Sequence, residues 1–347
     1  MKRALLMGMS TSISRALVTG ATGFVGRALV PQLVAHGVSV RATTRAPETA
    51  PPRDGVEWTK CDVDVVADVE RALDGVDAAF FLVHGMGSGN ADYAEKERRA
   101  ARRFADIAAH SGVKRIVYLG GVAPAGARSE HLQSRLEVGK ILRAGAVPTL
   151  ELRASMIVGS GGASWQIVRD LAMRLPAMLL PAWTKARTCP VAIDDVVVAL
   201  VKGLDLPLPE SAWYDIPGPE TLTGREMLRS VAALRGRRIP GIEVPFLSVS
   251  LSSWWLKLVT RTDFTLAREL VLGFTGDLLP TSDEYWGLIG YTPKWSFVEA
   301  ARKALVDEPR EGDVWGVSGR LEESLVQLVG PKLETPATSP AVPSPRK

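Results

Sequence analysis

Three glycines at intervals of three residues, Gly20, Gly23 and Gly26, follow a short β-branched and apolar run that ends near Val18. The residues after them continue as a helical run to about His36. A strand that turns through such glycines directly into a helix is the first half of a βαβ unit, because small residues let the helix pack closely on the strand. The sequence therefore predicts a parallel sheet that begins at this turn.

Strand-like and helical runs keep alternating as far as Arg153, which is the pattern of a parallel sheet covered by helices. The expected strands span residues 15–20, 38–44, 56–59, 78–83, 115–119 and 149–153. The expected helices span residues 23–36, 66–73, 93–110 and 131–144. A glycine follows each helix and predicts a left-handed end: Gly37, Gly75, Gly112 and Gly145. Six such strands predict a complete, doubly wound α/β sheet, the Rossmann fold.

The pattern changes after Arg153, where Trp and Pro become frequent and the alternation loosens. One helix is expected at residues 224–235, with Thr221 and Thr223 as candidate caps, and another at residues 297–306, after Ser296. We expect a smaller, mixed α/β C-terminal cap in this half. The expected segments are an N-terminal extension at residues 1–13, the Rossmann domain at 14–160, an interleaved substrate or cap region at 161–330 and a disordered Pro-rich tail at 331–347.

Composition excludes several classes of protein. The chain has 42 Lys and Arg against 38 Asp and Glu, a formal charge of +4, and no basic block that predicts a nucleic-acid partner. Cys61 and Cys189 lie far apart without the spacing of a metal site, so neither a metal nor a disulfide is expected. No apolar run reaches the ~18 to 20 residues of a membrane-spanning helix. We expect a protein of the reducing cytoplasm.

An apolar stretch at residues 244–260 contains the adjacent Trp254 and Trp255. Burial in the core is the simplest interpretation of this stretch. Exposure of the two Trp side chains would instead favour peripheral contact with a membrane surface.

The glycine turn also fits the chemistry of a pyrophosphate. Gly20 permits the tight turn, Gly23 lets the backbone approach the phosphates, and Gly26 allows close packing of helix and strand. The helix would present unsatisfied N–H groups to the phosphate oxygens. We therefore expect a dinucleotide at this turn. The expected contacts are Gly20, Thr22, Gly23, Phe24, Val25 and Gly26.

The end of the second expected strand bears on the choice between NAD(H) and NADP(H). NAD-selective sites commonly place an acidic residue there to bind the ribose hydroxyls. This sequence has Thr44 and Arg45 instead. A guanidinium binds a 2′-phosphate through charge-assisted hydrogen bonds, so we expect NADP(H) to be preferred over NAD(H). Arg41 is a second candidate, and a solvated surface arginine is the alternative interpretation of Arg45.

Two further segments follow expected strands at the edge where open α/β sheets bind ligands. Asp62 and Val63 follow the third strand, and Asp62 is placed to accept a hydrogen bond from an adenine amino group. Asp64 is expected to cap the next helix. His84 is interpreted either as a hydrogen-bonding support or as a weak catalytic candidate. The segment after the fourth strand consists of Leu82, Val83 and His84.

Several runs of the sequence together carry a resemblance to a known family. They are residues 19–26, 61–63, 113–121, 150–153, 191–196 and 290–293, which cover most of residues 14–306. These runs resemble the short-chain dehydrogenase/reductase superfamily, specifically its atypical, extended-like branch of NAD(P)H-binding proteins. A looser similarity points to nitrogen-regulator-type NADP sensors and to the nucleotide-binding accessory subunit of respiratory complex I.

The resemblance implies a catalytic site from which this sequence departs. Active members use a Ser after strand five and a Tyr-x-x-x-Lys motif on the next helix. This sequence has Gly120 and Gly121 at the strand end, His131 in place of Tyr and Arg135 in place of Lys. Arg135 is implied to contact the cofactor, although a guanidinium is a poor acid or base. His131 is either a proton-transfer group or an exposed residue of the first helical turn.

Two functions therefore stay open. The first is an NADP(H)-dependent oxidoreductase that acts on a small-molecule substrate without the usual Tyr-Lys pair. The second is a non-catalytic NADP(H)-binding regulator, redox sensor or assembly factor whose state a partner protein reads. Sugar-nucleotide epimerisation or dehydration is weakened by the missing pair.

Overall fold

The computed structural model describes most of the chain up to residue 308. The described ranges are 13–83, 93–123, 129–174, 178–180, 182–236, 241–243 and 276–308. Contacts divide the chain into two units, Met1–Asp307 and Glu308–Lys347, and the fold below is that of the first. The expected tail at residues 331–347 lies outside the described residues, as do His84, Trp254 and Trp255.

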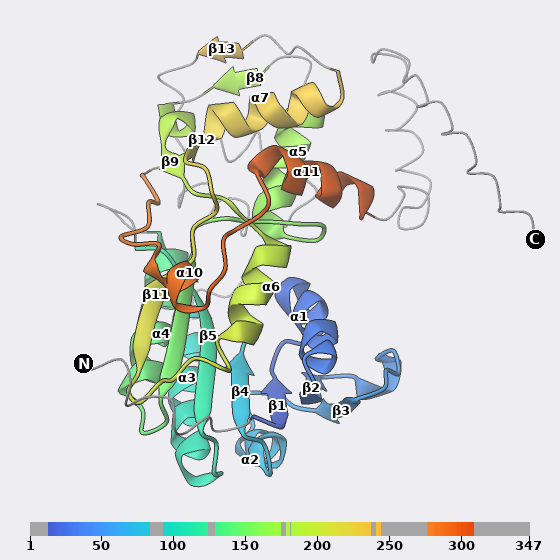
Figure 1. Cartoon of the computed structure of the whole chain (residues 1–347), viewed down its shortest axis with the longest axis vertical. Coiled ribbons are helices and arrows are strands. Elements are labelled where there is room, and N and C mark those ends of the chain that lie inside the picture. The colour runs from blue at the N-terminus through green and yellow to red at the C-terminus, as the bar shows by residue number, and fades with distance from the viewer. Residues whose placement is uncertain are drawn as a thin grey trace, which may run out of the picture. The chain divides into compact units, whose positions relative to one another are not determined.

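A parallel sheet of seven strands forms the centre of this unit (Figure 1). The strands lie in the order β11-β6-β5-β4-β1-β2-β3, and all neighbours are parallel. Their bounds are β1 (Arg15–Val18), β2 (Ser39–Thr44), β3 (Val56–Lys60), β4 (Ala78–Phe81), β5 (Arg115–Gly121), β6 (Thr149–Ala154) and β11 (Ala212–Asp215). The order reverses between β1 and β4, so the predicted doubly wound Rossmann fold is confirmed.

Helices cover both faces of the sheet. On one face lie α1 (Phe24–Ala35), α6 (Ile193–Lys202) and α10 (Glu284–Leu288), and on the other lie α2 (Val66–Leu73), α3 (Tyr93–His110) and α4 (Glu130–Ala144). Each face has its own apolar core, because alternate strand residues point to opposite sides. Leu17 of β1, for example, packs with α2 and α3, whereas its neighbours Ala16 and Val18 pack with α1 and α6.

A third core lies beyond the carboxyl ends of the strands. It is built from α5 (Ala163–Arg174), α7 (Gly224–Leu234) and α11 (Phe297–Val306), around the fully buried Trp165 and Phe297. Thr223 and Ser296 form capping boxes with Glu226 and Glu299, as expected for two of the predicted caps.

Short elements connect and flank this third core. They are η1 (Pro47–Thr49), β7 (Ile157–Val158), β8 (Met178–Leu180), η2 (Ala182–Lys185), β9 (Arg187–Thr188), β10 (Val191–Ala192), β12 (Leu222–Thr223) and β13 (Gly241–Glu243). The pairs β7 with β10 and β8 with β13 are parallel, and β9 with β12 is antiparallel.

Three local expectations were wrong. The sheet has a seventh strand, β11, drawn from the second half of the chain. Gly37, Gly75 and Gly112 have positive φ, but Gly145 has a φ of −70° and ends α4 in extended backbone. Asp64 does not cap α2, whose N-cap residue is Val65 without a side-chain bond; the Asp64 carboxylate instead pairs with Arg103 at 3.4 Å.

The buried Arg115 ties β5 to the end of α6. Its guanidinium donates to the carbonyl oxygens of Gly203 at 2.6 Å and of Leu204 and Leu206 at 2.7 Å each. These carbonyls belong to Gly203, the C-cap residue of α6, and to the segment that follows it. Arg115 therefore satisfies buried backbone acceptors and fixes the end of α6 on the sheet, although α6 comes from a distant part of the sequence.

Replacing Arg115 with methionine is expected to destabilise the protein by about 2 kcal/mol, because buried carbonyls would lose their donor. Urea unfolding measures this loss. The matched control is Lys114→Met, which removes a half-exposed ion pair with Asp77 and is expected to cost less than about 1 kcal/mol. Equal losses in the two variants would contradict a capping role for Arg115.

Candidate functional site

The glycine turn lies where the strand order reverses. Gly20 has a φ of +66°, and a Cβ atom there would lie 2.7 Å from the carbonyl oxygen of Leu82. The Thr19 hydroxyl joins the two strands, since it donates to the Phe80 carbonyl at 3.0 Å and accepts from the Leu82 N–H at 3.0 Å. The β1–α1 turn and the end of β4 therefore form one rigid crevice edge, where open α/β sheets bind ligands.

The turn leaves no room for side chains at its other glycines. A Cβ atom on Gly26 would lie 2.6 Å from Cα of Ala21, so α1 packs directly on the turn. A Cβ atom on Gly23 would lie 3.1 Å from the Gly20 carbonyl oxygen, to which the Gly23 N–H donates at 2.9 Å. Gly23 and Thr22 are exposed, which leaves the backbone open to approach by a ligand.

The N-terminus of α1 lacks both a side-chain cap and an acidic residue. Its N-cap residue, Gly23, makes no side-chain cap bond, and its first turn has no acidic residue. By contrast, α4, α7 and α11 have side-chain caps, and α2, α6 and α10, which lack such caps, have an acidic residue in the first turn. The N–H groups of the first turn of α1 are thus left for another acceptor, and the positive end of the helix favours an anion. The residues present fit a dinucleotide pyrophosphate.

Arg45 follows β2 at the same edge of the sheet. Its side chain is exposed, and no described residue forms an ion pair or hydrogen bond with it. Arg41 is committed elsewhere: its Nη1 donates to the carbonyls of Arg71, Ala72 and Asp74 at the end of α2. Of the two arginines, Arg45 is therefore the one available to a ligand.

Asp62 and Val63 lie just after β3, the strand beside β2, at the same edge of the sheet. The Asp62 carboxylate accepts a hydrogen bond from the backbone N–H of Asp64 at 2.9 Å. The backbone N–H of Asp62 donates to the Asp68 carboxylate at 3.0 Å. These bonds hold a compact turn in which both residues are half-buried. Leu82 is buried and Val83 half-buried at the end of β4.

A second glycine-rich segment covers the start of α1. Cβ atoms on Gly159 and Gly162 would each lie 3.0 Å from the Phe24 ring, and Gly161 adopts a φ of +86° near Arg27. Phe24 and Val25 are half-buried beneath it. The contact with Phe24 places this segment beside the glycine turn.

His131 lies in the first turn of α4 and is buried, with 7% of its surface exposed, so the interpretation as an exposed residue was wrong. Among the described residues its Nδ1 finds no hydrogen-bond partner. Burial, and then the nearby Arg135, lower the pKa of the imidazole to about 3. His131 is consequently neutral at pH 7.

Arg135 lies one turn after His131, and its guanidinium donates to the carbonyl oxygen of Leu119 at the end of β5. A Cβ atom on Gly121 would lie 3.5 Å from Nε of Arg135. The Tyr118 hydroxyl donates to the Arg135 carbonyl at 3.1 Å, and burial raises the pKa of this phenol. The absence of a side chain at Gly121 thus gives Arg135 its path across the strand end.

A buried charge cluster behind α4 was not predicted. Glu151 of β6 is fully buried, and its carboxylate accepts from Nε of Arg143 at 2.7 Å and of Arg153 at 2.8 Å. A Cβ atom on Gly139 of α4 would lie 2.5 Å from Cδ of this carboxylate. The Arg153 guanidinium also lies 3.9 Å from the ring centre of Trp213 on β11. The cluster joins α4, β6 and β11.

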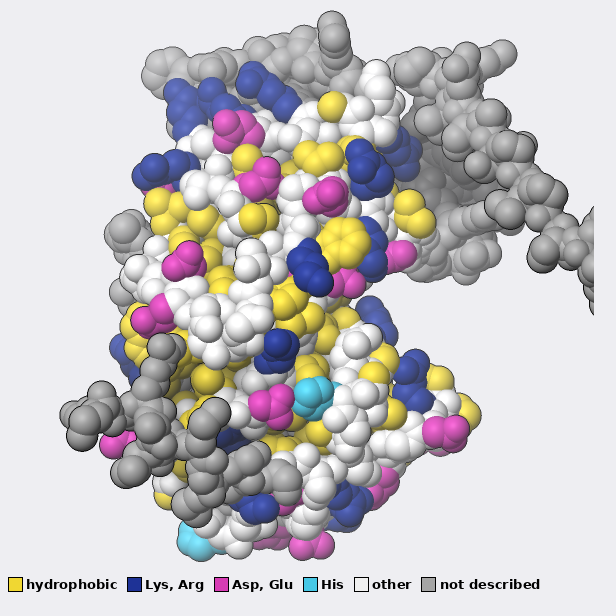
Figure 2. Space-filling model, in the orientation of Figure 1, with side chains coloured by type: hydrophobic (Ala, Val, Ile, Leu, Met, Phe, Trp, Pro, Cys, Tyr) yellow, Lys and Arg dark blue, Asp and Glu magenta, His cyan; other side chains and the backbone are white. Residues whose placement is uncertain are grey.

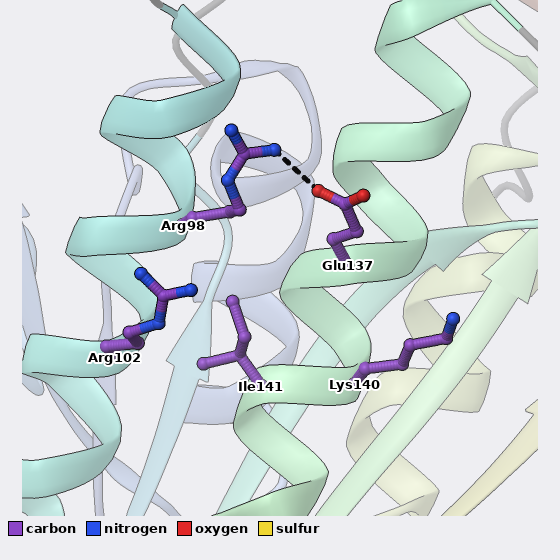
Figure 3. Close-up of a pocket in the computed structure, with 5 residues that line it drawn as sticks. All are labelled: Arg98, Arg102, Glu137, Lys140 and Ile141. Carbon is purple, nitrogen blue, oxygen red and sulfur yellow. Dashed lines mark hydrogen bonds and ion pairs between the residues drawn. The ribbon is translucent and has the colours of Figure 1, made fainter.

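The hollow in Figure 3 lies on the outer side of α3 and α4. Its lining residues are Arg98, Arg102, Glu137, Lys140 and Ile141. Arg98 donates to Glu137 at 2.6 Å. These residues belong to a charged surface separate from the strand ends.

Surface charge gathers unevenly on the face in Figure 2. Acidic and basic side chains are interspersed over its lower part, whereas Lys and Arg gather along its upper edge.

In the part of the chain that the structure describes, no helix is both long and apolar enough to cross a membrane. Within the same residues, no group of three His, Cys, Asp or Glu side chains is arranged to hold a metal.

Comparisons with known proteins agree with this geometry. A protein-family model described as NAD(P)H-binding matches residues 20–173, from the glycine turn into α5. A (4-alkanoyl-5-oxo-2,5-dihydrofuran-3-yl)methyl phosphate reductase of Streptomyces griseus is 28% identical over 78% of this chain and 92% of its own length. These matches are consistent with the expected resemblance to the short-chain dehydrogenase/reductase superfamily.

Two further proteins extend the comparison. A ceramide reductase of Caulobacter vibrioides is 27% identical over 73% of this chain and 83% of its own length. A nucleoside-diphosphate-sugar epimerase of Staphylococcus aureus shares the fold with a TM-score of 0.68 and 16% identity, over 83% of this chain and 99% of the epimerase. The chain therefore spans more than four fifths of the length of each of these proteins. The narrower resemblance to NADP sensors stays a prediction.

Proposed function

We propose that the protein is an NADP(H)-dependent reductase that works without the usual Tyr-Lys pair. The observation that carries the proposal is the uncapped, glycine-lined start of α1 at the strand reversal, inside residues that match an NAD(P)H-binding family. The extensive similarity to two reductases supports reduction as the reaction. When bound, the cofactor would supply a hydride.

The chain's own residues would bind and orient the reactants. The N–H groups at the start of α1 hold the pyrophosphate, and Asp62 and Val63 receive the adenine. Leu82, Val83 and Arg135 lie along the route to the nicotinamide. The substrate would bind beside the Gly159–Gly162 segment, which covers the start of α1. His131 and Arg135 face it from α4.

Arg45 supports a preference for NADP(H). An acidic residue at this position would repel the 2′-phosphate, whereas an exposed guanidinium without a protein partner among the described residues is free to bind it. No acidic side chain follows β2 before Glu48.

Replacing Arg45 with alanine is expected to raise the Kd for NADPH by about 10- to 100-fold, because a charge-assisted hydrogen bond contributes roughly 1.5 to 3 kcal/mol. The Kd for NADH should change less than about twofold. Fluorescence titration of each cofactor measures both values.

The matched control is Arg53→Ala. Arg53 is also exposed, but it precedes β3 and lies at the opposite end of the sheet. Its removal changes the net charge equally and should leave both Kd values unchanged. Similar losses of NADPH and NADH affinity in Arg45→Ala would refute the assignment of the 2′-phosphate site.

The reaction itself is tested by NADPH oxidation with a panel of carbonyl, enone and quinone compounds. Turnover that falls in His131→Ala, in a protein that still binds NADPH, supports the reductase. Tight NADPH binding with no turnover of any compound would instead favour the non-catalytic regulator, redox sensor or assembly factor.

A further inference from the structure

The proposed reductase site combines a fixed positive charge with a neutral hydrogen-bond donor. Arg135 and His131 lie one turn apart on α4, beside the end of β5, where Gly120 and Gly121 carry no hydroxyl. The guanidinium of Arg135 supplies the positive charge. Because the pKa of His131 is lowered to about 3, its imidazole is neutral and donates hydrogen bonds rather than protons.

The hydroxyl groups of Tyr118 and Ser134 beside this pair have other partners. The Tyr118 hydroxyl donates to the Arg135 carbonyl, and the Ser134 hydroxyl donates to the buried carboxylate of Glu97. Glu97 comes from α3, so this bond also fixes the two helices against each other. Neither of these two hydroxyls is thus placed to give a proton to a substrate oxygen.

Hydride acceptors differ in what they require from such a site. An isolated ketone becomes an alkoxide, a localised strong base that requires a proton as the new C–H bond forms. A C=C bond conjugated to a carbonyl becomes an enolate, whose charge spreads onto the carbonyl oxygen. A positive charge and a hydrogen-bond donor stabilise that oxygen without transferring a proton to it.

We propose that the site reduces conjugated carbonyl compounds at their C=C bond, with Arg135 and the N–H of His131 holding the enolate oxygen. The hydride of NADPH forms a C–H bond at the β-carbon, and the C=C electron pair moves to the carbonyl oxygen. A proton from water completes the α-carbon, and the oxidised cofactor leaves. The inference rests on the proposed function, because it names the substrate class of the same site.

The test compares matched substrates that differ only in the C=C bond. The purified full chain is given NADPH with pairs such as 2-cyclohexenone and cyclohexanone, a linear enone with its saturated ketone, and an aryl enone with its saturated ketone. We expect kcat/KM to be at least about 100-fold higher for the enones, the size of effect that one oxyanion-stabilising donor provides. The product should be the saturated ketone.

Isotopes follow the two new C–H bonds. With NADPH deuterated at C4, deuterium should appear on the β-carbon of the product. In D2O with ordinary NADPH, deuterium should appear on the α-carbon instead. This readout uses the wild-type protein and does not depend on any variant folding.

A pair of variants tests the role of the two side chains. The double variant His131→Tyr, Arg135→Lys supplies an acidic phenol and a lysine, and it should raise the ketone-to-enone ratio of kcat/KM at least about tenfold. Gln133→Tyr places the same ring on an exposed position of α4 and should leave the ratio unchanged.

The outcomes separate this inference from the proposed function. Reduction of ketones to alcohols as fast as enones would overturn the inference and leave the reductase intact. Binding of NADPH without turnover of any pair would overturn both.

Discussion

Replacing Gly139 with alanine is expected to destabilise the protein by about 3 kcal/mol, although Gly→Ala in an ordinary helix stabilises it by up to about 1 kcal/mol. The new methyl carbon would lie 2.5 Å from Cδ and 2.6 Å from Oε2 of Glu151. Such distances are shorter than any van der Waals contact. Either α4 must move away from the sheet or the carboxylate must leave Arg143 and Arg153.

Both responses are costly because Glu151 is fully buried. Breaking a buried ion pair leaves an uncompensated charge and costs about 3 to 5 kcal/mol, whereas moving α4 opens the core between the helix and β6. The free energy of unfolding from urea titration measures the change. Gly139→Ala combined with Glu151→Asp, which shortens the acid by one methylene, should cost less than the sum of the single changes.

The matched control is Gly287→Ala in α10. Gly287 is exposed, and no atom lies within 4 Å of the position of its Cβ, so alanine should be neutral or slightly stabilising there. A neutral Gly139→Ala would show that α4 does not rest on the carboxylate and would contradict the packing described here.

This cluster shows what the sequence pattern could not predict. Residues 150–153 read Leu-Glu-Leu-Arg, an alternation typical of a strand with one face in solvent. In the protein, α4 covers that second face, so Glu151 and Arg153 are buried and neutralise each other. Whether a charged strand face is covered depends on tertiary packing.

The fold itself was largely predictable because its signals are local. The bounds of α2, α3 and α11 agree with the expected helices at 66–73, 93–110 and 297–306, where the spacing of apolar residues is helical. The seventh strand was missed because β11 has only four residues, too few to show a period. Its place is set by pairing with β6, which lies about 60 residues earlier in the chain.

The candidate site was predictable in part for a related reason. The carboxyl ends of parallel strands meet at one edge, so the positions of the glycine turn, Arg45, Asp62 and Leu82 follow from the strand order. The burial of His131 does not follow, since it depends on which face of α4 packs against the sheet. The burial of His131 makes the stability of the protein depend on pH.

The stability of the protein should fall as pH decreases from about 6.5 toward 3, through His131. Its pKa is lowered from 6.5 to about 3 in the folded protein, so between these values the unfolded chain binds a proton that the folded protein does not. Stability therefore rises with pH across this window and is lost on acidification, by about 1.4 kcal/mol per pH unit. The loss attributable to His131 should be about 2 kcal/mol at pH 5.

Urea unfolding between pH 7.5 and 4.5 measures this slope while most carboxylates stay ionised. In His131→Leu, which fills the site without a titrating group, the slope should disappear above pH 5. His110→Gln, on an exposed position of α3, should keep the wild-type slope.

Several charged groups lie on the elements packed against His131: Arg135 on α4, Glu97 on α3, Glu151 on β6 and the Tyr118 phenol on β5. Arg135 acts in the same direction as burial, because a fixed positive charge disfavours a second one nearby. Wild-type and His131→Leu curves that run parallel would mean that His131 takes up a proton in the folded protein. The imidazole would then be an acid near neutral pH, and the site would suit isolated ketones rather than conjugated ones.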